Sequence, residues 1–153
     1  MIETVSRAIG VAVCFGAAGA LTSLAFVLEA RDPTAAHLVP AAAFAAALVS
    51  ALVWPHCTRA PSLGHGALRG AAIGFLAHPV LWMLMLGHVG TTTPGLTTSP
   101  AAVLAPALVL GLFSTLAYGP LTMSVGAALG GLLARCEPPL PRSMRLSYID
   151  DKQ

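Results

Sequence analysis

The sequence predicts an all-α integral membrane protein, folded as a bundle of four transmembrane helices. Charged residues make up 9% of the 153 residues, against about 25% in a typical soluble domain, and the mean hydropathy is +0.80. From Gly70 to Ala134 the chain contains no Asp, Glu, Lys or Arg. A soluble fold must cover its surface with polar groups, so this composition favours helices in lipid, where each helix satisfies its own backbone hydrogen bonds.

The first two spans are expected at residues 9–28 and 38–54. Twenty residues at about 1.5 Å each reach about 30 Å, the thickness of the hydrocarbon core of a bilayer. The N-terminus resembles a secretory signal, because Arg7 precedes an apolar stretch. That stretch continues through Leu28, which is long for a signal segment, so we expect a retained first span. Trp54, at the end of the second span, suits an interfacial anchor.

The third span is expected at residues 70–89 and the fourth at 101–134. Pro79 lies in the middle of the third span and predicts a kink near His78, because proline removes one backbone hydrogen bond. The fourth stretch would be about 51 Å long as one helix, which exceeds the bilayer. It is interrupted by Pro106 and by Gly119–Pro120. The stretch is therefore one kinked helix, an interfacial piece followed by a span, or two half-length segments.

The basic residues predict that both termini lie in the cytoplasm. With four spans, seven of the eight basic residues fall on one side and only Arg31 on the other, as the positive-inside rule requires. A fifth crossing would move Arg135 and the three basic residues after it to the wrong side. Residues 135–153 then form a cytoplasmic tail containing prolines and arginines. A bacterial inner membrane fits this bias best, and the net charge of +2 is too small to predict nucleic-acid binding.

Small residues recur every four positions in the third and fourth spans. Such a spacing produces one slowly winding ridge, and glycines in the ridge allow close backbone approach by a neighbouring helix. The ridges predict either packing within the bundle or an interface with another protein. The predicted packing residues are Gly66, Gly70, Gly74, Gly126 and Gly130.

His78 is the most notable side chain of the predicted spans, because ionisable groups at mid-membrane depth are candidates for function. A hydrogen bond to Ser114 or Tyr118 would satisfy its ring, and the alternatives are proton relay, solute contact or metal and haem ligation. No second histidine is expected at a similar depth, so we expect no cofactor. The candidate polar site within the membrane comprises His78, Ser114, Tyr118 and Thr122.

Two further groups of residues lie outside the predicted spans. His56, Cys57, His65 and Cys136 offer a Cys2His2 set, but their spacing matches no standard zinc signature, so we expect no metal. The charged turn that begins at Glu29 forms an interfacial cluster or a mouth that attracts solute.

The sequence contains no motif that specifies a reaction. It shows no phosphate-binding loop, no nucleophile with a paired base and no carboxylate inside a predicted span. We therefore expect a protein that is not an enzyme, and that acts by helix–helix packing as an accessory, assembly or immunity-type partner. Its expected partners are the lipid bilayer and another membrane protein or a second copy of itself. The alternative is a small-solute transporter or channel that uses the polar seam of the third and fourth spans.

Overall fold

The computed structural model is all-helical and describes residues 2–31, 33–54, 62–92 and 99–136. Four of its helices are long and apolar enough to cross a membrane. The elements are α1 (Ile2–Ala30), a 3-10 helix η1 (Pro33–His37), α2 (Leu38–Val53), α3 (Leu63–Thr92) and α4 (Pro100–Cys136).

Helix α4 is one continuous α-helix of 37 residues, with Pro106 and Pro120 inside it. The chain therefore does not divide this stretch into two helical segments. At about 1.5 Å per residue it extends about 55 Å, well beyond a bilayer of about 30 Å. Helix α3 contains Pro79 and also extends past the predicted span at both ends, since it begins at Leu63 and ends at Thr92.

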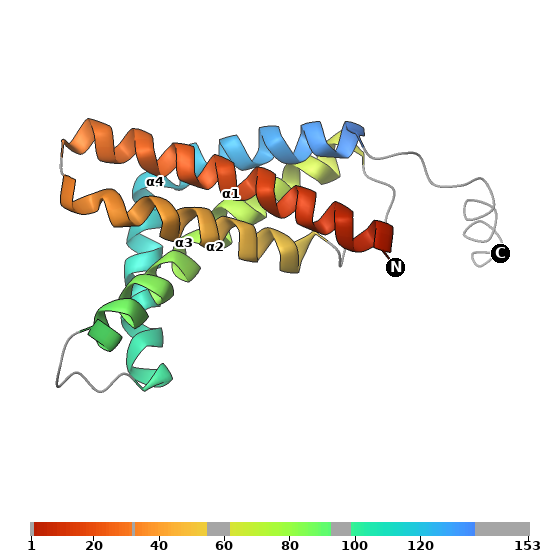
Figure 1. The fold of residues 1–153 in the computed structure, drawn as a ribbon. Coiled ribbons are helices and arrows are strands. Elements are labelled where there is room, and N and C mark those ends of the chain that lie inside the picture. Colours follow the sequence, from red (N-terminus) through yellow and green to blue (C-terminus); the bar gives the residue numbers. More distant parts are fainter. Residues whose placement is uncertain (1, 32, 55–61, 93–98, 137–153) are drawn as a thin grey trace.

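The helices are arranged as two antiparallel pairs. Helix α1 packs on α2, α2 packs on α3, and the most extensive contact joins α3 to α4, with a smaller contact between α1 and α4. Figure 1 shows that the C-terminal part of α3 and the N-terminal part of α4 extend together away from α1 and α2. We call this protruding pair the outer arm.

Close backbone packing joins α1 to α2. A methyl group at Gly19 would lie 2.8 Å from the carbonyl oxygen of Ala42, and one at Gly16 would lie 3.2 Å from that of Ala43. These close contacts require short side chains on both helices. After α1 the chain turns through Arg31, whose φ of 54° is the left-handed conformation that ends many helices.

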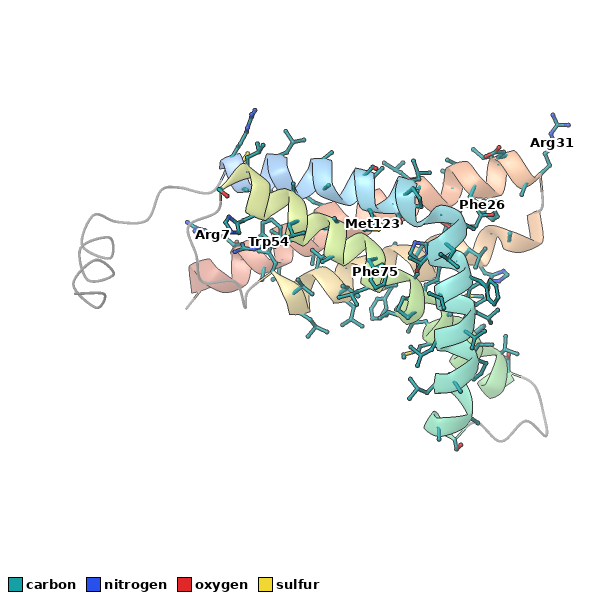
Figure 2. All side chains as sticks on the ribbon, turned by 180° about the vertical axis from the view of Figure 1, so that it is seen from behind. Arg7, Phe26, Arg31, Trp54, Phe75 and Met123 are labelled. Atoms are coloured by element: carbon teal, nitrogen blue, oxygen red, sulfur yellow. The ribbon has the colours of Figure 1, made fainter. Side chains whose placement is uncertain are left out.

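The core lies between α1, α2 and α3 near the end of the molecule that carries the N-terminus. Phe15 packs on Trp54 with ring centroids 6.1 Å apart, and Ile73 is fully buried beside them. The guanidinium of Arg69 lies 5.9 Å from the Trp54 ring centroid, a cation–π distance. Figure 2 shows Arg7 and Trp54 toward this end and Arg31 at the opposite end.

Candidate functional site

The glycine ridges of α3 and α4 pack against each other inside the chain. A methyl group at Gly70 would overlap the carbonyl oxygen of Gly126, and one at Gly130 would overlap that of Gly66. One turn further along α3, a methyl group at Gly74 would lie 2.6 Å from the carbonyl oxygen of Thr122. Each step of four residues along α3 thus meets a step of four back along α4. The structure brings all five predicted packing glycines into one intramolecular interface.

His78 lies one turn beyond Gly74 in the same interface and is 7% exposed. Its Nδ1 lies 2.7 Å from the hydroxyl oxygen of Ser114, and its Nε2 lies 2.9 Å from that of Thr122. Both partners are on α4, so one histidine ring connects two turns of the neighbouring helix. Both ring nitrogens are satisfied although the ring is buried, as buried polar groups require.

One tautomer of the ring gives every donor in this network an acceptor. The Thr122 hydroxyl lies 3.2 Å from the carbonyl oxygen of Gly119 and 3.3 Å from that of Tyr118, and it has a single proton to donate. When Thr122 donates to the backbone, Nε2–H of His78 donates to Thr122. Nδ1 of His78 then accepts the proton of Ser114, so every donor in the network has an acceptor.

Tyr118, the fourth residue of the predicted polar site, does not join this network through its side chain. Within the described segments no hydrogen bond connects its hydroxyl to His78. Its ring reaches α1 instead, where it packs edge-on against Phe26 with centroids 5.0 Å apart, and the residue is 45% exposed. Tyr118 therefore connects the polar centre of α3 and α4 to helix α1.

An open groove of about 560 Å³ lies between α1 and the α3–α4 pair and reaches this polar centre. Its walls are mostly apolar and aromatic, and a few residues of α2 complete them. Sequence patterns did not indicate the groove, because it arises where helices distant in the sequence diverge. Its lining includes Phe15, Thr22, Phe26, Glu29, Ala42, Ala77, His78, Trp82, Phe113, Ser114, Ala117, Tyr118 and Thr122.

The groove extends along α1 from Phe15 to Glu29, about 21 Å of helix. Glu29, which the hydropathy pattern placed just beyond the first span, belongs to the last turn of α1 and is exposed. Among the described residues that line the groove, Glu29 alone carries a formal charge. The groove therefore has one charged end and a long apolar body.

Trp82 lines the groove on α3, and its indole Nε1 is buried without a hydrogen-bond partner in the described part of the chain. An indole N–H in this position is unusual, because buried side-chain donors nearly always have an acceptor. Trp82 lies four residues after His78, so it continues the four-residue spacing of the α3 ridge.

The Cys2His2 set falls partly outside the described residues, since His56 and Cys57 are among residues 55–61. His65 hydrogen-bonds Ser62, with 2.6 Å between its Nδ1 and the hydroxyl oxygen, and Cys136 is exposed at the end of α4. No three His, Cys, Asp or Glu side chains gather in a metal-binding arrangement within residues 2–31, 33–54, 62–92 and 99–136.

No protein family, no curated protein and no solved structure matches this chain. The class of this protein is therefore described from its fold and its groove alone. The chain is a small helical membrane protein with four apolar helices and a groove that ends beside a buried, fully hydrogen-bonded histidine.

Proposed function

We propose that this chain is a non-catalytic membrane protein that binds a small amphipathic solute in the groove and carries it through the membrane. The observation that supports this proposal is the groove itself, whose volume of about 560 Å³ falls within the roughly 300–1,000 Å³ of typical small-molecule sites. Mostly apolar walls with a few polar groups are also typical of such sites. The predicted packing glycines, by contrast, pack α3 against α4 within the chain.

Proline placement supports movement beside the groove. Pro79 packs on α4, because a methyl group at Gly111 would lie 2.7 Å from the Pro79 Cα atom. Pro120 is two residues from Thr122, which bonds the residue next to Pro79. Proline weakens the helix that contains it, so α3 and α4 are weakened at a similar level. We place a kink at each position, and interrupted helices beside a polar site are a common feature of transporters.

We propose that the groove has a binding role and not a catalytic one. Its titratable side chains are Glu29, His78 and Tyr118. His78 has both ring nitrogens engaged by hydroxyl groups of its own chain. Among the described residues, no carboxylate is oriented on the histidine to support Ser114 or Thr122, as nucleophilic catalysis by a hydroxyl usually requires.

A groove-filling substitution tests the proposal. The purified protein, reconstituted in nanodiscs, is titrated with N-phenyl-1-naphthylamine, a neutral apolar fluorophore, and empty nanodiscs give the background. Ala117 lines the groove, whereas Ala105 on the same helix is exposed and outside it. We expect Ala117→Trp to abolish the protein-dependent signal and Ala105→Trp to retain it. Equal binding by the two variants would refute the groove as the site.

A second candidate function is that of an accessory protein, and it rests on the outer arm. Four leucines of α4 are exposed at intervals of four residues, so they form one apolar ridge on the arm. An apolar ridge of this kind suits a helix of another membrane protein or of a second copy of the chain. The ridge consists of Leu104, Leu108, Leu112 and Leu116, which are 46%, 50%, 58% and 70% exposed.

Gentle purification from the native membrane, followed by mass spectrometry, tests this second function. A stoichiometric partner that is lost on Leu108→Ala/Leu112→Ala would support the accessory function. Retention of that partner by the double variant, or recovery of the chain alone as a monomer, would oppose it. Leu21→Ala/Leu28→Ala is the matched control, because these leucines are both 68% exposed on α1, away from the ridge.

We further propose a bacterial inner membrane as the location, with both termini in the cytoplasm. The placement of Arg7, Arg69 and Arg135 supports this orientation. Arg69 lies beside Trp54, toward the end that carries Arg7 (Figure 2). Arg135 follows Ala134, whose side chain meets Gly66 near the start of α3. We therefore propose the lipid bilayer as a partner of the protein, and we propose no binding of nucleic acid.

A further inference from the structure

The charged end of the groove indicates the chemistry of the solute. We propose that the groove binds an amphipathic organic cation, with its positive group beside Glu29 and its apolar body along the wall. This inference rests on the proposed function, since it names the class of molecule that the same groove takes. It adds a requirement for positive charge that the volume and the apolar walls do not impose.

Glu29 provides a negative charge with no opposing cation in the lining. No Lys or Arg occurs among the described residues that line the groove. The nearest arginine in the sequence, Arg31, extends away from the helices in Figure 2. A solute cation would thus meet one carboxylate, and opposite charges attract each other.

Aromatic rings lie on the same side of α1 as Glu29. Phe26 is three residues before Glu29, and positions three apart lie on one face of a helix. Its ring packs edge-on against Tyr118 at 5.0 Å, and both rings line the groove. The faces of aromatic rings attract cations, including quaternary ammonium groups. A carboxylate with two rings therefore recognises a positive group that is bulky and weakly hydrated.

The length of the groove explains why the cation should carry an apolar body. From Glu29, in the last turn of α1, the groove continues about 21 Å to Phe15. That distance exceeds one leaflet, which is about half of the 30 Å hydrocarbon core. A small hydrophilic cation would leave this apolar wall uncovered. An amphipathic cation places its charge near the membrane surface and its apolar part in the interior.

The test compares a cationic and a neutral probe on the same variants in nanodiscs of zwitterionic lipid. Tetraphenylphosphonium is the cation, followed by equilibrium dialysis, and N-phenyl-1-naphthylamine is the neutral probe. We expect Glu29→Gln to weaken protein-dependent tetraphenylphosphonium binding roughly three- to tenfold, and to weaken binding of the neutral probe far less. Glu29→Asp, which keeps the charge, should retain most of the cation binding.

The outcomes separate the two proposals. If Glu29→Gln binds tetraphenylphosphonium as tightly as the wild type while Ala117→Trp binds neither probe, the groove is a site but the cation inference is wrong. If Ala117→Trp binds both probes normally, the proposed function itself fails. Equal weakening of both probes by Glu29→Gln would also overturn the inference, because a general disturbance of the groove would then explain the loss.

Discussion

Substitution of Gly74 by alanine would test the close packing of α3 on α4. The added methyl group would lie 2.6 Å from the carbonyl oxygen of Thr122 and 3.2 Å from the Met123 Cα atom. These are backbone atoms of α4, so no side chain can rotate to make room. Ordinary contact begins at 3.4 Å, so the helices would have to separate by about 0.8 Å.

The expected cost is about 1–3 kcal/mol, the usual range for overpacking a dense interior. Alanine recovers part of this, since glycine inside a helix is less favourable than alanine by about 0.5–1 kcal/mol. Separation at Gly74 also lengthens the hydrogen bonds of His78, one turn away. We therefore expect Gly74→Ala to destabilise the protein by about 1–2 kcal/mol overall.

The matched control is Gly87→Ala in the same helix, where an added methyl group meets nothing within 4 Å. This variant should be neutral or up to about 1 kcal/mol more stable. Titration of the purified protein from a mild detergent into SDS, followed by tryptophan fluorescence, measures both free energies of unfolding. A Gly74→Ala protein as stable as Gly87→Ala would refute the proposed approach of the two backbones.

Three further predictions concern single side chains. His78→Leu should destabilise the protein by about 0.6–2 kcal/mol in the same SDS titration, because it removes the bonds to Ser114 and Thr122, and an unchanged midpoint would count against that network. Tyr118→Leu should cost about 0.5–1.5 kcal/mol by removing the ring pair with Phe26, whereas Tyr118→Phe should cost nothing measurable; equal losses would mean that the hydroxyl matters instead. With Cys136 as the sole cysteine, an impermeant maleimide should label the protein only after permeabilisation of intact cells, and labelling without permeabilisation would overturn the cytoplasmic C-terminus.

Hydropathy located the four helices well but not all of their ends. The predicted second span, residues 38–54, agrees with α2 (Leu38–Val53) to within one residue. Helix α3 begins at Leu63, ahead of the predicted residue 70, because the helix continues through Arg69, which precedes the uncharged stretch. The 3-10 helix at Pro33–His37 was not predicted.

The sequence predicted those contacts of the candidate site that follow from the four-residue spacing within a helix. Steps of four residues placed Gly70 and Gly126 on facing ridges, and the same steps predicted Ser114 near His78. The direction of the Tyr118 ring was not predictable, because it depends on Phe26 from a distant helix. The groove and the position of Glu29 in it depend likewise on how α1 meets the α3–α4 pair, which no local pattern encodes.

The four-residue repeat between α3 and α4 has a consequence for the alignment of the two helices. A slide of one turn, about 5.4 Å, would bring Gly70 to the level of Gly130 and Gly74 to that of Gly126, so small residues would still face small residues. The glycines alone therefore tolerate more than one alignment. His78 does not, since its two nitrogens require both Ser114 and Thr122. The buried histidine therefore fixes the alignment of two helices that the glycines alone would allow to slide by one turn.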